Sequence, residues 1–459
     1  MASVPRLVVA GASSNAGKTL LCCGIARALS RRGLRVACFK SGPDYIDAAY
    51  LSAASGVPAG NLDTWLMGAP YIRDRVFMAG HEADLVLVEG VRSLYDGADA
   101  VHDEGSTAHL AKLLEAPVVL VINARSLARG IAAVAKGFAS LDPSVDVRGV
   151  ILNMVKGPVH EDKCRVALRE LAGMQTYGSI ARDPALGTPM RHLGLLTVQE
   201  HPEVEAYLEL LADVAEAHVD LDALLELAHG APPLEGGADE HPGRQCPGVR
   251  MGVAYDAAFS FYYPEMYTVA RRCGADIALV SPLTDRRLLP SLDCLYIGGG
   301  YPECHASLLA SNDRFMADVA ARSAEGMPVY AECAGLLYLS RSLVAADGRS
   351  YPMAAVLDAD ARMCARCQSV SYAVVMTRHS SLIAQQGEML RGHEFHYSSL
   401  TPDPDVRYAY DVLRGSGIDG AHDGIVTHNV LAQYCHLHFG SQSCRLATFL
   451  AHGAAYGRT

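Results

Sequence analysis

The feature that most constrains the fold is an alternation, in the first half of the chain, between short apolar runs and amphipathic segments. The runs occupy residues 6–10, 34–40, 84–90, 117–123 and 148–153, and each is apolar almost throughout. Such runs are typical of parallel strands that are covered on both faces. Segments with helical spacing lie between them, for example 18–32 and 106–115. The alternation predicts an α/β fold with a doubly wound parallel sheet.

A second α/β pattern follows a break in composition. Helical spacing continues through 203–230, after which residues 231–248 are rich in glycine and proline and show no periodicity. Strand-like runs then recur at 249–256, 275–281, 294–300 and 327–333, with helical segments near 261–273 and 305–325. A chain of 459 residues is also too long for one ordinary core. We therefore predict a domain over 1–230, a linker over 231–248 and a second α/β domain over 249–459.

Composition argues against several classes of function. The net charge is −11, without a basic stripe, so nucleic acid is not expected as a partner. No apolar run reaches the roughly 18 residues of a membrane span, and the first apolar run is too short for a signal-peptide core. The thirteen cysteines are odd in number and scattered, which is typical of reduced thiols in a cytoplasmic protein.

The first run leads into the sequence GASSNAGKT, residues 11–19, and then into a predicted helix. Strand, small-residue loop and helix in this order are typical of a phosphate-binding loop, although Gly11 lies one residue too far from Gly17 for the strict pattern. We expect Gly11, Asn15, Ala16 and Gly17 to form the cradle, Lys18 to neutralise phosphate and Thr19 to reach Mg²⁺. The alternative is a turn that caps a helix and leaves Lys18 solvated.

Carboxylates at predicted strand ends are candidates for completing a magnesium site. Glu89 ends an apolar run, where a metal-binding carboxylate of a nucleotide site is expected. Asp63, Asp44 and Asp47 are further candidates, with turn or helix-cap roles as the alternative. Lys40 ends another run and could reach the transferred phosphoryl group.

A second site is predicted where the run 327–333 ends at Cys333 and an apolar helical segment begins. A cysteine at a sharp strand-to-helix turn is typical of a nucleophile, with the Ala334 amide and the glycines up to Gly300 as oxyanion donors. His436 or His438 could serve as its base. The alternative is a buried structural cysteine. The stretches CARC (364–367) and RGHEFHYS (391–398) lack the spacing of a zinc site.

Taken together, motifs spread along nearly the whole chain resemble the cobyrinate a,c-diamide synthase family, whose C-terminal half is a class I glutamine amidotransferase domain. The shared strings are GASSNAGKT, FKSGPDYID, NLD, EGVRSLYDG, STA, RHLGLLT, FYYPE, GGYPE, YAECAGLLYL, RGHEFHYS and YCHLHF. The shifted first glycine also occurs in this family and in the related dethiobiotin synthetases. The N-terminal half is accordingly expected to resemble the dethiobiotin-synthetase fold, and the C-terminal half a flavodoxin-like α/β fold.

The resemblance implies a chemistry. Cys333 would attack the side-chain amide of glutamine with His436 as base, while the usual triad carboxylate is absent and His438 stands near its place. The ammonia would cross to the N-terminal site, where ATP and Mg²⁺ convert the a- and c-acetate carboxylates of cobyrinate, or hydrogenobyrinate, to acyl phosphates. Residues Lys18, Thr19, Lys40, Asp63 and Glu89 match the phosphate- and metal-handling positions of related folds. A homodimer is considered for the assembly.

Two departures and two alternatives accompany the resemblance. Arg92-Ser93 stands where the family commonly has Met-Gly, and residues 362–372 replace a Gly-Lys stretch. Cations that could meet a polycarboxylate substrate are Arg92, Arg191, His192, Arg362 and Arg391. A related branch amidates nickel-sirohydrochlorin by the same mechanism. A MinD/ParA-like switch ATPase with a non-catalytic C-terminal module is the alternative from another class.

Overall fold

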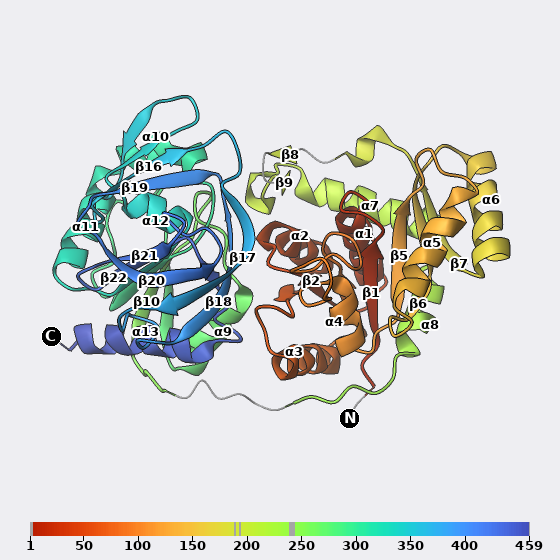
Figure 1. Cartoon of the computed structure of the whole chain (residues 1–459), viewed down its shortest axis with the longest axis horizontal. Coiled ribbons are helices and arrows are strands. Elements are labelled where there is room, and N and C mark those ends of the chain that lie inside the picture. Colours follow the sequence, from red (N-terminus) through yellow and green to blue (C-terminus); the bar gives the residue numbers. More distant parts are fainter. Residues whose placement is uncertain (1–2, 188–189, 192–193, 238–243, 459) are drawn as a thin grey trace. The chain divides into compact units, whose positions relative to one another are not determined.

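The computed structural model describes residues 3–187, 190–191, 194–237 and 244–458. The chain divides into two compact units, Met1–Asp239 and Glu240–Thr459, each with its own sheet and core (Figure 1). No helix in the described ranges is both long enough and apolar enough to cross a bilayer.

Unit 1 is built on a seven-stranded sheet in the order β3-β2-β4-β1-β5-β6-β7, in which every adjacent pair is parallel. The strands are β1 (Arg6–Gly11), β2 (Val36–Ser41), β3 (Gly60–Leu62), β4 (Leu85–Glu89), β5 (Val118–Asn123), β6 (Val147–Val155) and β7 (Gln175–Ala181). All five predicted runs are strands of this sheet. The short β3 and the less apolar β7 were not predicted.

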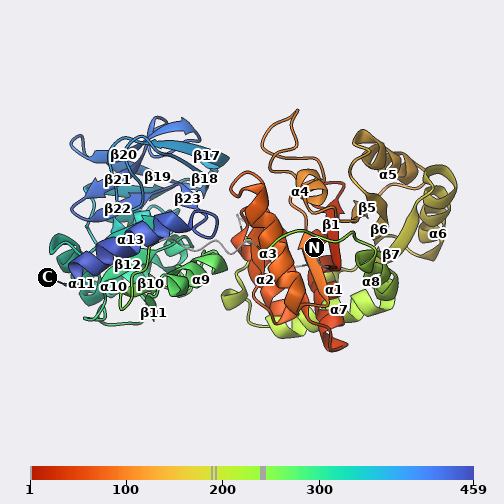
Figure 2. The ribbon, with the colours of Figure 1, turned by 90° about the horizontal axis from the view of Figure 1, so that it is seen from below.

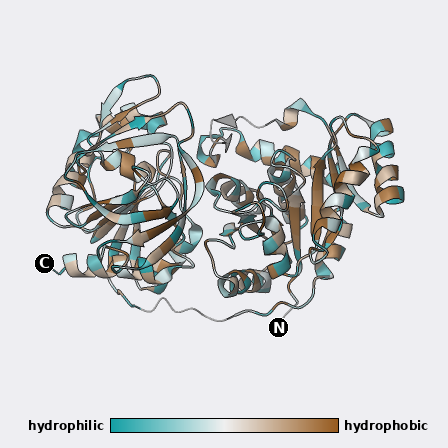
Figure 3. Ribbon diagram, in the orientation of Figure 1, coloured by the Kyte–Doolittle hydropathy of each residue, from teal (hydrophilic) through white to brown (hydrophobic). Residues whose placement is uncertain are grey.

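Helices cover both faces of the unit 1 sheet, which confirms the doubly wound fold (Figure 2). They are α1 (Lys18–Arg31), α2 (Tyr45–Ser55), α3 (Ala69–Glu82), α4 (Thr107–Leu113), α5 (Gly130–Leu141), α6 (Pro158–Ala167), α7 (Val204–His218) and α8 (Leu221–His229). Figure 2 shows α4 and α5 on one side of the central strands and α1, α7 and α8 on the other. Figure 3 shows why: the central strands are hydrophobic along their length, so both faces must be covered.

The predicted helical segment 203–230 is two helices in the structure. The helical conformation is interrupted at Val219 and Asp220. The Asp220 side chain accepts a hydrogen bond from the amide of Ala223 and so caps α8. Residues 231–248, predicted as a linker, are anchored at both described ends. The amide of Gly237 donates to Asp74 in unit 1, and the amide of Cys246 donates to the Cys273 carbonyl in unit 2.

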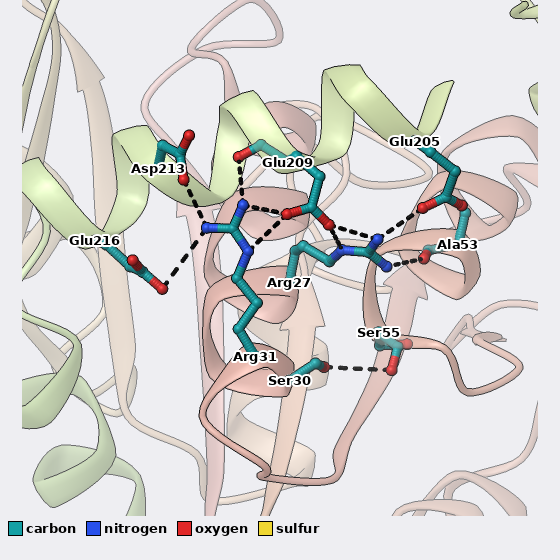
Figure 4. A network of polar contacts seen from close by, with 9 residues as sticks. All are labelled: Arg27, Ser30, Arg31, Ala53, Ser55, Glu205, Glu209, Asp213 and Glu216. Carbon is teal, nitrogen blue, oxygen red and sulfur yellow. Dashed lines mark hydrogen bonds and ion pairs between the residues drawn. The ribbon is translucent and has the colours of Figure 1, made fainter. Parts of the chain in front are cut away.

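Helices α1 and α7 of unit 1 pack closely against each other. Gly24 of α1 lies against the main chain of α7, since a Cβ at this position would come 2.5 Å from the Leu211 carbonyl oxygen. Beside this contact, Arg27 and Arg31 of α1 pair with a row of α7 carboxylates: Glu205, Glu209, Asp213 and Glu216 (Figure 4). Glu209 accepts hydrogen bonds from both arginines, so the pairs form one network.

Unit 2 is built on a ten-stranded sheet in the order β11-β10-β12-β13-β22-β21-β20-β17-β18-β23. Its first five members pair in parallel and the remaining pairs are antiparallel. The strands are β10 (Arg250–Ala254), β11 (Asp276–Val280), β12 (Cys294–Ile297), β13 (Val329–Glu332), β17 (Ser369–Thr377), β18 (Met389–His396), β20 (Arg407–Arg414), β21 (His422–Thr427), β22 (Val430–Gln433) and β23 (His436–Leu437).

Other elements surround this sheet. A four-stranded sheet contains β14 (Ser342–Val344), β15 (Ser350–Pro352), β16 (Ala359–Met363) and β19 (Ser398–Pro402). The helices are α9 (Pro264–Arg272), α10 (Ala306–Ser311), α11 (Asp313–Ala324), α12 (Ala334–Leu339) and α13 (Ser443–Tyr456). The predicted helix 305–325 is therefore interrupted at Asn312, whose side-chain amide donates to the carbonyl oxygens of Pro282 and Asp285.

The ten-stranded sheet curls back on itself at its last strand. β22 ends at Gln433 beside β13, yet three residues later His436 of β23 pairs with His393 of β18, at the far end of the strand order. A chain can bridge these two places in three residues only if the sheet is strongly curved. The curvature brings β18 and β23 to the carboxyl end of β13.

The close approach of α1 and α7 yields a prediction. Gly24→Ala should destabilise unit 1 by about 1–3 kcal/mol, because the added Cβ meets a main-chain carbonyl that cannot move aside alone. Gly137→Ala in α5 is the matched control: nothing lies within 4 Å of the place that its added methyl group would take, so it should stabilise by up to about 1 kcal/mol. Calorimetric unfolding of both variants measures this difference in sign. Equal midpoints would contradict the packing described.

Candidate active sites in the two units

The loop between β1 and α1 has the shape of a phosphate cradle. Gly17 adopts φ 90°, the left-handed region, and α1 begins at the next residue. A side chain at position 17 would be strained and would collide with Nδ2 of Asn153, which donates to the Ala16 carbonyl at 2.8 Å. The loop is therefore held from outside by β6, and its shape requires glycine at this one position.

Lys18 is folded over this loop. Its Nζ donates to the carbonyl oxygen of Arg92 at 2.6 Å and lies 3.4 Å from those of Ser13 and Ser14. The side chain is buried, and burial together with the nearby Lys40 ammonium lowers the pKa of Lys18. The alternative of a solvated surface lysine does not hold.

Glu89, at the end of β4, is the centre of a buried charged cluster. Its Oε1 accepts from Thr19 Oγ1 at 2.7 Å and from Lys40 Nζ at 2.6 Å, and Lys40 also pairs with Asp47 at 2.7 Å. Burial raises the pKa of the Glu89 carboxyl to about 7, against the opposing effect of Lys40. Lys40 is itself buried, yet Asp47 and Glu89 raise its pKa above the ordinary lysine value. Thr19, Lys40 and Glu89 are thus brought together as their positions predicted.

The other candidate carboxylates near this cluster have helix-cap and turn roles. Asp44 caps α2 by accepting from the Asp47 amide, and burial beside Asp47 raises the pKa of Asp44 to about 6. Asp63 Oδ1 accepts from the amides of Trp65 and Leu66 at 2.7 and 2.9 Å. Among the described residues, no group of three or more His, Cys, Asp or Glu side chains has the arrangement of a metal site.

A cavity of about 280 Å³ opens beside the start of α1. It is lined by apolar side chains of α1 and α7 and by residues of the segment 180–187 at the end of β7, with Gly17, Asn153 and Met154 beside them. An apolar cavity with a few polar groups, adjoining a helix N-terminus, has the character of a nucleotide-base site.

In unit 2, Cys333 stands on a strained turn between β13 and α12. Its backbone adopts φ 49° and ψ −99°, a combination that costs on the order of 1–3 kcal/mol for a residue other than glycine. The Cys333 amide donates to the Gln433 carbonyl at 2.8 Å, which fixes the turn to β22. Because Ala334 opens α12, its amide lies at the helix N-terminus next to the thiol.

His436 lies against Cys333 and is almost fully buried. Burial alone would lower its pKa, but interactions with the Cys333 thiol and the Glu332 carboxylate raise the pKa of His436 to about 10. The ring of His393 stacks on it at 4.8 Å and 8°. The main chain at Gly299 completes the surroundings, since a Cβ there would lie 2.8 Å from His436 Cε1. The predicted oxyanion residue Gly300 directly follows.

His438 does not extend this pair. Its Nδ1 accepts from the Ser441 amide at 3.0 Å, and its Nε2 lies 3.6 Å from Glu265. The ring of Tyr263 packs edge-on against it, and the Tyr263 hydroxyl also lies 2.9 Å from His393 Nε2. Of the two predicted bases, the structure places His436 beside the thiol.

The two zinc-like motifs have other roles. In RGHEFHYS, His393 stacks on His436 and His396 stacks on Tyr434 at 3.8 Å. In CARC, Cys367 Sγ lies 3.2 Å from the Ser369 carbonyl and Cys364 Sγ lies 3.6 Å from Ser399 Oγ.

The candidate substrate cations are divided between the two units. Arg92, Arg362 and Arg391 are exposed, the first in unit 1 and the other two in unit 2. His192 and the side chain of Arg191 lie outside the described residues. Their part in substrate binding stays a prediction.

Three residues at these sites were not predicted. Asn153 braces the predicted phosphate loop from β6, His393 stacks on His436, and Glu332 contacts His436 from the position before Cys333. The apolar strand pattern could not separate Asn153 or His393 from structural residues. Glu332 is adjacent to Cys333, so its contact with a histidine about a hundred residues away follows only from the fold.

Both halves of the chain match known protein families. Residues 7–195 match the CobQ/CobB/MinD/ParA nucleotide binding domain, and residues 250–444 match the CobB/CobQ-like glutamine amidotransferase domain. Three curated relatives are each called cobyrinate a,c-diamide synthase. The protein of Dehalococcoides mccartyi strain CBDB1 is 39% identical, covering 95% of this chain and 96% of its own. That of Archaeoglobus fulgidus is 40% identical (95% and 94%), and that of Syntrophotalea carbinolica is 40% identical (96% and 96%).

Similarity at this level extends over nearly the whole length of this chain and of each relative. It includes both the half that carries the phosphate loop and the half that carries the Cys333–His436 pair. The chain belongs to the cobyrinate a,c-diamide synthase family.

Proposed function

We propose that this chain is a glutamine-hydrolysing, ATP-dependent ligase that amidates the a- and c-acetate carboxylates of cobyrinate. The observation that carries the proposal is the contact between Cys333, on its strained turn, and His436 in a chain that also holds a phosphate loop. A cysteine–histidine pair and a phosphate loop can each occur in a protein without the other. Together they supply what amide synthesis from glutamine requires, namely a source of ammonia and a means of activating an acid.

The glutaminase half of the reaction belongs to unit 2. Cys333 Sγ attacks the side-chain carbonyl carbon of glutamine, and the developing oxyanion is met by main-chain amides, for which Ala334 and Gly300 are the candidates. His436 carries the proton that the departing nitrogen takes, so the C–N bond breaks with release of neutral ammonia. Water then hydrolyses the glutamyl thioester to glutamate and restores the thiol. The raised pKa of His436 suits it to hold that proton at neutral pH.

The ligase half belongs to unit 1. The γ-phosphoryl group of ATP is transferred to a substrate carboxylate, ADP leaves, and ammonia displaces phosphate from the acyl phosphate to give the amide. The loop around Gly11, Asn15, Ala16 and Gly17 would hold the phosphates with Lys18, which must leave the Arg92 carbonyl to do so. The apolar cavity beside Asn153 would take the base.

The residues at this site fit Mg²⁺. Glu89 Oε2 is buried and has no hydrogen-bond partner among the described residues, and Thr19 Oγ1 is next to the other oxygen of the same carboxylate. Hard oxygen donors of this kind are what Mg²⁺ prefers. Thr19 and Glu89 would hold the ion, with Asp63 as a further candidate, and its charge would neutralise the phosphates.

The substrate is assigned by the names of the relatives and by the chemistry. Incubation with glutamine, ATP and Mg²⁺ plus cobyrinate, hydrogenobyrinate or nickel-sirohydrochlorin, followed by mass spectrometry, counts the amides formed on each. We expect two amides on cobyrinate or hydrogenobyrinate. Amidation of nickel-sirohydrochlorin alone would transfer the assignment to that branch. ATP turnover without glutaminase activity would favour a switch ATPase. The thirteen free cysteines fit a reducing, cytoplasmic setting.

The thiol provides the first test of this proposal. Cys333→Ser should reduce glutamine-dependent amidation at least about 10³-fold, because the hydroxyl is a far weaker nucleophile, and should preserve amidation supplied with ammonium salts. Cys444→Ser, at an exposed cysteine of α13, is the control and should leave both rates unchanged. Glutamine-dependent amide formation that survives in Cys333→Ser would contradict the assignment.

Glu89 provides a second test, through pH. Below about pH 7 its carboxyl takes up a proton and loses the charge that attracts Mg²⁺, so the Kd for MgATP should rise by up to about tenfold from pH 7 to pH 6. In Glu89→Gln, binding should be weak and should lose this component of the pH dependence. Isothermal titration of both proteins makes the comparison, with Glu82→Gln at the exposed end of α3 as control. Identical pH profiles in wild type and Glu89→Gln would exclude the metal role.

A further inference from the structure

The glutaminase site contains a carboxylate in an unexpected place. Glu332 precedes the nucleophile in the chain, is 1% exposed, and its Oε2 lies 3.6 Å from His436 Nδ1. In this family the carboxylate that usually follows the histidine is absent, and position 438 is a histidine. A carboxylate that faces the imidazole at Nδ1 is therefore already present, supplied by the strand that leads into Cys333.

The Glu332 carboxylate is held in place by three donors from three strands. Oε2 accepts from the Tyr296 hydroxyl of β12 at 2.7 Å. Oε1 accepts from the Tyr330 hydroxyl of β13 at 2.6 Å and from the Leu437 amide of β23 at 3.0 Å. The last hydrogen bond fixes the residue next to His436, so the same carboxylate lies close to the imidazole and anchors the adjoining main chain.

Stability alone does not account for a carboxylate at this position. Burying a charged group costs free energy that its hydrogen bonds only partly return, and apolar residues of similar volume are often neutral or better. Buried charges that face an ionisable partner in a catalytic site are instead a common means of setting that partner's orientation and protonation.

The other titratable groups around His436 do not fill this role. Cys333 is the nucleophile. His393 stacks face to face on His436, and burial with the neighbouring His436 and His438 lowers the pKa of His393 well below the ordinary value. His438 uses Nδ1 for the Ser441 amide, while its Nε2 lies beside Glu265.

We propose that Glu332 is the positioning residue of the glutaminase, orienting His436 through Nδ1 so that Nε2 serves Cys333. The inference rests on the glutaminase activity proposed above. It makes the nucleophile and the carboxylate neighbours in the chain, Glu332-Cys333, instead of placing the carboxylate two residues after the histidine.

Glu332→Gln tests the proposal, because it keeps the shape of the side chain and removes its charge. The glutaminase kcat should fall at least about 100-fold with little change in KM for glutamine, since Glu332 is almost fully buried and its oxygens already accept from Tyr296, Tyr330 and Leu437. The pKa of His436, followed by NMR of histidine-labelled full-length protein, should fall below its wild-type value by the part of the upward shift that Glu332 contributes, while the part that Cys333 contributes is kept. The NMR readout does not depend on activity and reports only folded protein.

Asp423→Asn is the matched control. Asp423 is an equally buried carboxylate that accepts from the Tyr434 and Cys435 amides at 3.0 and 2.9 Å, so it braces the same segment without facing the imidazole. It should lower the thermal midpoint while leaving the pKa of His436 near its wild-type value. Glu332→Asp, which keeps the charge, should hold that pKa above its value in Glu332→Gln.

Three results would overturn the proposal: an unchanged pKa of His436 in Glu332→Gln, an equal drop in Asp423→Asn, or a drop produced by His438→Gln and not by Glu332→Gln. Wild-type protein without glutaminase activity would instead refute the proposed function, and the NMR titration would still decide whether Glu332 controls His436.

Discussion

Both candidate sites depend on the same constraint, a buried parallel strand that passes into a helix through a turn with unusual backbone angles. In unit 1 the turn from β1 to α1 requires a left-handed residue, and Gly17 meets the requirement without a side chain. In unit 2 the turn from β13 to α12 places the left-handed φ on Cys333 itself. Neighbouring strands hold both turns through Asn153 and Gln433, and in the proposed mechanism each turn directs main-chain amides at the point where negative charge is bound or develops.

Buried charge is the second element that the two sites share. Glu89 accepts from Thr19 and Lys40, and Glu332 Oε2 lies 3.6 Å from Nδ1 of His436. Each carboxylate ends the parallel strand that delivers it, β4 in one unit and β13 in the other. A charged group can be buried there because strand ends expose main-chain amides, hydroxyls and cations from neighbouring elements. In the mechanism proposed above, these buried carboxylates set the protonation and charge of their neighbours, which both phosphoryl transfer and amide cleavage require.

The family and the fold class were predictable from sequence and are confirmed, because continuous apolar runs and a glycine-rich loop leave local signals. Lys18 and Thr19 were predicted from the phosphate-loop motif, and Lys40 and Glu89 from their positions at strand ends; the structure brings Thr19, Lys40 and Glu89 into contact. Glu332 and the role of His393 were not predicted, since both arise from the curl of the unit 2 sheet that returns β23 to β13. The spacing of residues in the sequence does not predict a contact that depends on the curvature of the whole ten-stranded sheet. The roles of the individual site residues stay predictions.

The central claim is that ammonia released from glutamine in one unit is consumed at the activated acid in the other. Its most direct test uses glutamine labelled with ¹⁵N in the side-chain amide, in the presence of excess unlabelled ammonium and at a pH where free ammonia is scarce. We predict that both new amides of the tetrapyrrole product carry ¹⁵N, because neutral ammonia is used before it mixes with the solvent pool. Product amides without ¹⁵N, formed while glutamine is hydrolysed, would contradict the account.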